Sequence, residues 1–198
     1  APESALRLHD LVISAKASGL VCRSGWKNQT LWTADLGGPA LTPPTIAGDR
    51  VYVACAGSGK AKGYLHCRRL VDGGAFWSQE LDEAPVSHIV ASADWVSVPT
   101  ADDKIAVFKA ADGKARDPLV VGGRPVSPAL VHDTLIIAGE TRIAAHDLSG
   151  AEWLWNYKDQ DNIGKVAGQP VICLETIWVG TEKRGLLAIG IPPGQGRK

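Results

Sequence analysis

A repeat of about 40 residues runs through the whole chain and limits the folds open to it more than any other feature. One apolar position recurs in every unit, and its successive members lie 40, 44, 40 and 42 residues apart. These members are Leu11, Val51, Trp95, Leu135 and Ile177. A period of roughly 40–45 residues is that of a four-stranded β-propeller blade. Each unit is therefore expected to contain four short strands.

Each unit contains short segments rich in Val, Ile and Leu, separated by turns that contain Gly or Asp. Such segments favour strands, and single sheets of this length cannot bury both faces alone. Radial stacking of the sheets buries those faces and leaves few exposed edges. The sequence therefore predicts an all-β fold, a β-propeller of about five four-stranded blades that form an open or partial ring. It forms one domain, 1–198, with blades at about 1–37, 38–82, 83–122, 123–164 and 165–198.

Tryptophan closes three of these units, and we expect the three side chains to be equivalent. Trp32, Trp77 and Trp155 each follow the turn after the third predicted strand, while Arg116 lies near this position in the third unit. An aromatic side chain repeated in this way is suited to packing between neighbouring blades. We predict that all three tryptophans pack at equivalent blade-to-blade positions and are largely buried.

The composition limits the partners. Hydrophobic residues make up 45% of the chain and charged residues 21%, as in ordinary folded domains. Lys plus Arg number 21 and Asp plus Glu number 21, so no net charge favours nucleic acid, which we do not expect as a partner. No apolar run approaches the roughly 20 residues of a transmembrane helix, so we expect no transmembrane segment.

Three stretches resemble the pyrroloquinoline-quinone-like (PQQ-like) repeat family: 23–32, 108–114 and 145–155. The resemblance extends over essentially the whole chain and implies a β-propeller. Members of that family include quinone-dependent dehydrogenases and non-catalytic scaffolds, such as a propeller lipoprotein of bacterial outer-membrane β-barrel assembly. It also implies export, so we expect a periplasmic or extracellular bacterial protein.

The family's dehydrogenases are usually eight-bladed and bind calcium, and many carry a disulfide between adjacent cysteines. This chain has about five units and no adjacent cysteine pair. We therefore expect neither PQQ nor calcium as a cofactor. The segment 157–164 has the acidic and amide groups of a calcium loop but lacks its spacing, and we interpret it as a solvated linker.

The cysteines and histidines predict no catalytic or metal site. Cys22 and Cys67 occupy equivalent third-strand positions, where we expect small buried apolar residues. A disulfide between Cys55 and Cys67, across one hairpin, is the alternative. His9 and His132 fall in the same turn of non-neighbouring units, so we interpret both as turn residues rather than metal ligands.

Two adjacent carboxylate pairs, Asp82-Glu83 and Asp102-Asp103, also suggest no active site. Glycosidase carboxylates flank the bond that is cleaved, at roughly 5–9 Å from each other, which neighbours on one loop rarely achieve. We interpret both pairs as solvated loop charge.

Basic residues recur where propellers commonly bind partners. The turns between second and third strands and the linkers between blades lie on one face of such a fold. The candidate partner-binding residues there are Lys60, Lys62, Arg124, Arg142, Lys158, Lys183 and Arg184. They favour a recognition surface for a protein or an anionic glycan, with an ordinary charged surface as the alternative.

Without a recognisable catalytic constellation, the sequence favours a non-catalytic module that presents loops to a protein partner within a larger protein or complex. The alternatives are a fragment of a quinone-dependent dehydrogenase and a carbohydrate-binding propeller. The last unit ends after its third strand. We predict that this open blade edge, 186–190, pairs with another chain or with missing sequence.

Overall fold

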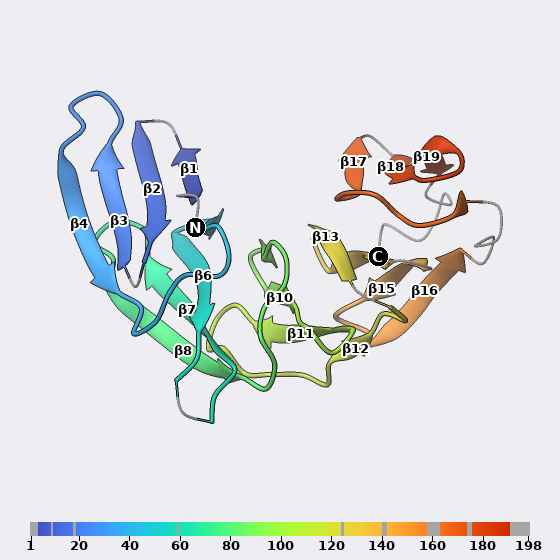
Figure 1. The fold of residues 1–198 in the computed structure, drawn as a ribbon, viewed down its shortest axis with the longest axis horizontal. Helices are drawn as coiled ribbons and strands as arrows, with labels where there is room; N and C mark the ends of the chain where they lie inside the picture. Colours follow the sequence, from blue (N-terminus) through green and yellow to red (C-terminus); the bar gives the residue numbers. More distant parts are fainter. Residues whose placement is uncertain are drawn as a thin grey trace.

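The structure, a computed structural model, consists of five antiparallel β-sheets that follow one another in chain order along an open arc (Figure 1). It describes residues 4–8, 10–17, 19–58, 60–123, 125–139, 142–157, 163–173 and 176–190. In these ranges no helix is long and apolar enough to cross a membrane. The predicted all-β propeller architecture is confirmed.

Four of the sheets have four strands, and hydrogen bonds join the strands of each sheet in chain order. The first sheet contains β1 (Ser4–Leu8), β2 (Leu11–Lys16), β3 (Gly19–Ser24) and β4 (Thr30–Asp35). The second contains β5 (Thr45–Ala47), β6 (Arg50–Ala56), β7 (Gly63–Arg69) and β8 (Ala75–Leu81). The third contains β9 (Val90–Ala91), β10 (Trp95–Pro99), β11 (Lys104–Lys109) and β12 (Leu119–Val120). The fourth contains β13 (Pro125–Val131), β14 (Thr134–Gly139), β15 (Ile143–Asp147) and β16 (Glu152–Tyr157).

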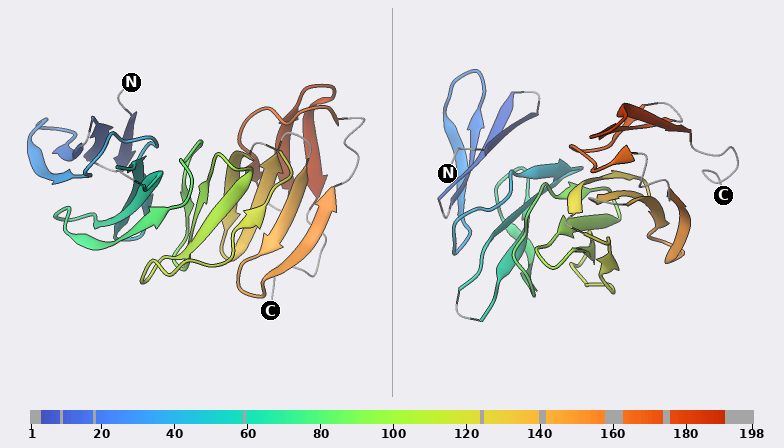
Figure 2. Two further views of the ribbon diagram at one scale, coloured as in Figure 1. Left: turned by 60° about the horizontal axis from the view of Figure 1, so that its bottom comes forward. Right: turned by 45° about the vertical axis from the view of Figure 1, so that its right-hand side comes forward.

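The fifth sheet, within the described residues, contains β17 (Val171–Cys173), β18 (Thr176–Thr181) and β19 (Gly185–Gly190). The residues after Gly190 lie outside the described ranges. Figure 2 shows the succession of sheets from two further sides.

Because the strands of each sheet are paired in chain order, the turns between them lie alternately on two opposite faces of the arc. Because neighbouring strands run antiparallel, second–third turns and the linkers between sheets lie on one side, which we call the linker face. First–second and third–fourth turns lie on the opposite side, the turn face. The last strands, β4, β8, β12 and β16, form the outer rim of the arc in Figure 1.

Apolar side chains fill the boundaries between sheets, because alternate residues of a strand point to opposite faces. Tyr52 and Ala54 of β6 pack against Val96 and Val98 of β10, and all four are fully buried. Similar apolar clusters lie at the other three boundaries. An inner sheet is therefore covered on both faces.

At each of the first two boundaries a tryptophan side chain of one sheet forms a hydrogen bond to the backbone of the next sheet. The indole Nε1 of Trp32 donates to the backbone carbonyl of Leu70 (2.9 Å), and Trp77 repeats this bond with Ala110 (3.0 Å). At the third boundary Arg116 replaces the indole and donates to the carbonyl of Leu148.

The predicted equivalence of the tryptophans is thus confirmed for the first two. The prediction of large burial holds for Trp32, which is 8% exposed, whereas Trp77 and Trp155 are only half-buried. Both belong to the last strands of their sheets, β8 and β16, at the outer rim of the arc.

The alternative of a Cys55–Cys67 disulfide is wrong. In the β6–β7 hairpin Cys55 lies opposite Tyr64, and Cys67 lies opposite Tyr52. Cys55 packs towards the first sheet and Cys67 towards the third, so the two thiols point to opposite faces and both are free. Cys22 and Cys67 are fully buried among apolar side chains, as predicted.

The outer strand of the third sheet is unusually short and shapes the surface around it. β12 has two residues, which pair with Lys104 and Ile105 of β11. Pro118 precedes it and has no N–H to extend the ladder. A hollow lies on each side of this strand, one towards the second sheet and one towards the fourth.

Candidate partner-binding site

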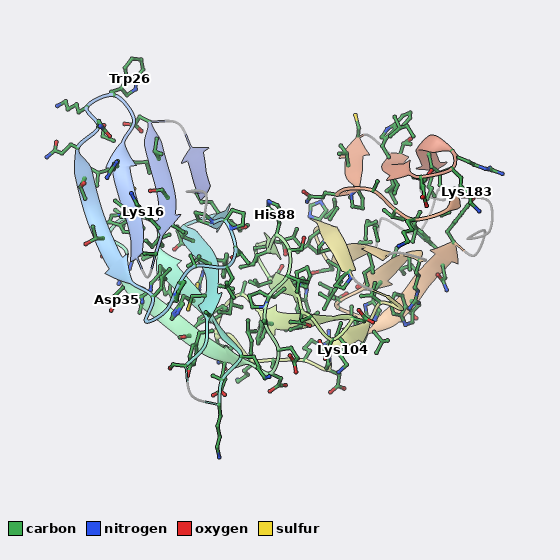
Figure 3. All side chains as sticks on the ribbon, in the orientation of Figure 1. Lys16, Trp26, Asp35, His88, Lys104 and Lys183 are labelled. Carbon is green, nitrogen blue, oxygen red and sulfur yellow. The ribbon has the colours of Figure 1, made fainter. Side chains whose placement is uncertain are left out.

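The predicted basic residues lie in turns of three different sheets. Lys60 and Lys62 belong to the β6–β7 turn, Arg142 directly precedes β15, and Lys183 and Arg184 form the β18–β19 turn. All of these turns belong to the linker face, and Figure 3 labels Lys183 near one end of the arc. Arg124 and Lys158 lie outside the described residues. The set is therefore spread along the arc rather than gathered in one cluster.

The side chain of Arg142 is held by two hydrogen bonds and a cation–π contact. Its Nη1 donates to the carbonyl of Val120 (3.1 Å) and its Nε to Oδ1 of Asn156 (3.2 Å). The guanidinium carbon lies 3.9 Å from the ring centroid of Trp153, in a cation–π contact. Burial lowers the pKa of Arg142, although the group stays charged at any physiological pH.

Arg142 and Trp153 line a groove between the third and fourth sheets, on the outer rim. We call this hollow of about 380 Å³ the Arg142–Trp153 groove. Its lining residues are Pro118, Leu119, Val120, Val121, Gly122, Arg142 and Trp153. Val120 is 59% exposed and Trp153 is 40% exposed, so apolar surface faces solvent here. Arg142 is the single charged residue of the lining.

His146 supports Trp153 from beneath. The two rings meet edge to face, with centroids 4.8 Å apart and planes at 90°. His146 is only 5% exposed, and its Nδ1 has no hydrogen-bond partner among the described residues. Burial, followed by the charge of Arg116, lowers the pKa of His146. The imidazole is therefore neutral at pH 7 and fixes the orientation of the indole.

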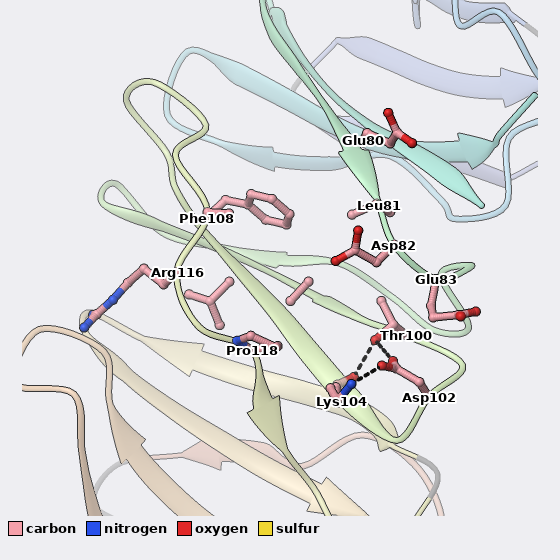
Figure 4. A pocket seen from close by; sticks show the side chains of 13 residues that line it. Glu80, Leu81, Asp82, Glu83, Thr100, Asp102, Lys104, Phe108, Arg116 and Pro118 are labelled. Atoms are coloured by element: carbon pink, nitrogen blue, oxygen red, sulfur yellow. Dashed lines mark hydrogen bonds and ion pairs between the residues drawn. The ribbon is translucent and has the colours of Figure 1, made fainter. Parts of the chain in front are cut away.

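A second hollow, of about 150 Å³, lies between the second and third sheets (Figure 4). Asp82 and Glu83 reach it from the end of β8, and Asp102 reaches it from the β10–β11 turn. Lys104 pairs with Asp102 at 2.6 Å, and Thr100 donates to the same carboxylate at 2.7 Å. The pair with Asp102 raises the pKa of Lys104, and Asp82 and Glu83 raise it further.

The sequence interpretation treated these carboxylates as solvated loop charge, and the structure adds that Asp82, Glu83 and Asp102 line one cleft. The signal was present in the sequence, because linkers and second–third turns lie on the same face of a propeller. The cleft's own lysine already partners Asp102.

The remaining candidates lie elsewhere. Cys55 contacts Nε2 of His66 (3.4 Å) inside the first boundary, where burial raises the pKa of the thiol. His132 occupies the β13–β14 turn with a left-handed φ of 51°, as a turn residue does. His9 and most of the segment 157–164 lie outside the described residues. Within the described ranges no group of three or more His, Cys, Asp or Glu residues is arranged to hold a metal.

Comparisons with known proteins agree with this architecture. A family model described as outer membrane protein assembly factor BamB matches residues 30–197. The crystal structure of BamB from Moraxella catarrhalis superposes with a TM-score of 0.75 at 19% identity, over 95% of this chain and 57% of that chain. No curated protein sequence gave a significant match.

Two computationally designed proteins also superpose. Ika8 gives a TM-score of 0.76 at 11% identity, over 94% of this chain and 57% of that chain. Ika4 gives 0.62 at 10% identity, over 77% and 91% respectively. At these identities the likeness concerns the fold alone. This chain spans little more than half the length of BamB and of Ika8.

Proposed function

The chain belongs to the family of outer membrane protein assembly factor BamB, and from that premise we propose that it is a non-catalytic, protein-binding module of bacterial outer-membrane protein assembly. The proposal places it in the periplasm, as a part of a larger protein or complex. The role requires neither PQQ nor calcium. The family's printed description and the propeller fold support it, since this fold presents loops of several sheets along one face.

The Arg142–Trp153 groove is the observation that carries this proposal. Tryptophan and arginine are the residues most enriched at the energetic centres of protein interfaces, especially beside apolar surface that a partner can dehydrate. Here a half-exposed indole, a fixed guanidinium and the exposed Val120 side chain lie together. The basic residues of the linker face, which are spread along the arc, would then add long-range attraction for an acidic partner.

Site-specific photo-crosslinking tests the proposal in the bacterium that makes the chain. A photoreactive amino acid replaces Val120 in the groove or, as control, Trp26. Trp26 is 84% exposed but lies in the β3–β4 turn, on the turn face (Figure 3). We expect adducts with subunits of the outer-membrane assembly machinery from position 120 and far fewer from position 26. Equal adducts from both positions, or none from position 120, would contradict the proposal.

A further inference from the structure

We propose that the Arg142–Trp153 groove binds an internal segment of a partner protein in which an Asp or Glu carboxylate adjoins a large apolar side chain. The inference rests on the proposed function, because it names the chemistry of the partner at the same groove. Three features of the groove carry it: the unused donors of Arg142, the rigidity of its guanidinium, and the apolar wall beside it.

The guanidinium of Arg142 retains donors for a carboxylate. An arginine side chain has five N–H donors, and Arg142 uses one on Nε and one on Nη1. It forms no ion pair with any carboxylate of the described residues, whose ion pairs lie elsewhere. Its positive charge, half removed from water, therefore favours an incoming anion over a neutral group.

The same guanidinium is held rigidly before anything binds. Its two hydrogen bonds and the stack on Trp153 fix its plane, and His146 fixes the indole in turn. A fixed planar fork binds a carboxylate through paired hydrogen bonds, at a lower entropic cost than a free lysine. Arg142 is thus better suited to recognition than Lys60 or Lys62, which lie in an exposed turn.

The wall beside Arg142 requires an apolar neighbour to the carboxylate. Pro118, Leu119 and Val120 offer only apolar side chains, and the indole of Trp153 faces them across the hollow. Burial of one leucine-sized side chain there removes apolar surface from water and so adds to the affinity. Residues 118–122 run as a strand and linker along the groove, so a bound chain can pass through it, and an internal side chain fits better than a chain terminus.

Titrations with short peptides test this chemistry. The probe is the blocked peptide Ac-Gly-Gly-Glu-Leu-Gly-Gly-NH₂, added to the ¹⁵N-labelled chain while the indole N–H signals are followed by NMR. A Trp153→Phe variant assigns the signal of Trp153. We expect that signal to shift with a dissociation constant in the millimolar range, as is usual for a contact of this size.

Matched peptides and variants separate charge from apolar contact. Replacement of Glu by Gln in the peptide should weaken binding about tenfold, the worth of a charge-assisted hydrogen bond. Arg142→Gln should abolish that difference, Arg142→Lys should restore part of it, and the control Lys27→Gln, on the turn face, should leave it unchanged. Circular dichroism spectra verify that each variant is folded.

Three results would overturn the inference: equal affinity for the Glu and Gln peptides, discrimination that survives Arg142→Gln, or tighter binding of a free C-terminal carboxylate in Ac-Gly-Gly-Leu-OH. Crosslinking from position 120 in the Arg142→Gln chain separates the two proposals. Adducts that persist undiminished leave the proposed function standing and remove this chemistry. If the chain discriminates between the peptides but forms no adduct in the cell, the groove chemistry stands and the proposed function is contradicted.

Discussion

The indole of Trp32 reaches across a sheet boundary and donates to the carbonyl of Leu70, while its six-membered ring covers Gly73 three residues later. Trp77 makes the same approach to Ala110 and Gly113. The contact between neighbouring sheets, which we call the joint, is therefore repeated at the first two boundaries. One side supplies an indole, and the other supplies a carbonyl and a glycine.

Truncation of this joint should be costly. Trp32→Ala removes a buried aromatic side chain and its hydrogen bond, and we expect a loss of about 3–5 kcal/mol in the free energy of unfolding. Trp32→Phe keeps most of the ring and should lose only about 1–2 kcal/mol. Urea denaturation measures both, with the exposed Trp26→Ala as the control. An effect of Trp32→Ala no larger than that of the control would refute the joint.

The glycine side of the joint can be tested with a matched pair. Gly73 and Gly48 both have left-handed φ angles, +72° and +60°, so alanine strains the backbone at either position. A Cβ at Gly73 would also lie 2.6 Å from the Trp32 ring, whereas at Gly48 it would meet nothing within 4 Å. Gly73→Ala should therefore destabilise the chain by at least about 1 kcal/mol more than Gly48→Ala. Equal midpoints of thermal unfolding would contradict this.

His146 should make the stability depend on pH. Burial lowers its pKa below the ordinary 6.5, so the unfolded chain binds the proton more readily than the folded chain. Its contribution is fully present above pH 6.5 and is lost as the pH falls from 6.5 towards the folded-state value. His146→Phe should reduce the difference in unfolding free energy between pH 7.5 and pH 5. An unchanged difference would mean that His146 does not titrate in this way.

The basic residues of the linker face should act mainly on the rate at which the chain associates with its partner. Simultaneous Lys60→Ala, Lys62→Ala, Lys183→Ala and Arg184→Ala should slow partner binding most at low ionic strength and little at high salt. Surface plasmon resonance with the partner identified by crosslinking measures this. Arg23→Ala with Lys27→Ala, on the turn face, is the control. A quadruple variant with wild-type association rates would exclude this surface.

The fifth sheet should associate with another surface. Trp178 and Leu186 are 38% and 66% exposed, although Tyr52 and Ile136, at the position of Trp178 in other sheets, are buried against a neighbour. We expect the isolated chain to self-associate, and Trp178→Lys with Leu186→Lys to suppress this. Light scattering measures the molecular mass of the wild-type chain and of the double variant in solution. A stable wild-type monomer of 20.9 kDa would contradict the prediction.

The fold could be predicted because every unit repeats the same pattern of short apolar strands and Gly- or Asp-containing turns. Five weak copies of one pattern indicate a propeller, and the spacing of Trp32 and Trp77 correctly placed both at boundaries. The thiols of Cys55 and Cys67 could not be placed in the same way. Their relative orientation depends on the register of the β6–β7 hairpin, and a shift of one residue exchanges the two faces.

The groove was harder to predict because it results from an interruption of the repeat. β12 has only two residues, and together with Pro118 they line the hollow beside Trp153. Arg142 was identified from its turn, but its stack on Trp153 depends on a side chain that crosses several residues of the sheet. Only three-dimensional packing distinguishes this arginine from the solvated lysines of the other turns.

Among the described residues each apolar cluster connects two adjacent sheets, so the arc is close to a one-dimensional array with nearest-neighbour coupling. Within this chain the second, third and fourth sheets each hold two such couplings, and the first and fifth each hold one. The free energy of local unfolding should therefore be lowest for the first and fifth sheets and higher for the three between them. Amide hydrogens of β6, β10 and β14 should exchange slowest. Those of β2 and β18 should exchange faster, because the first and fifth sheets unfold locally before the inner sheets do.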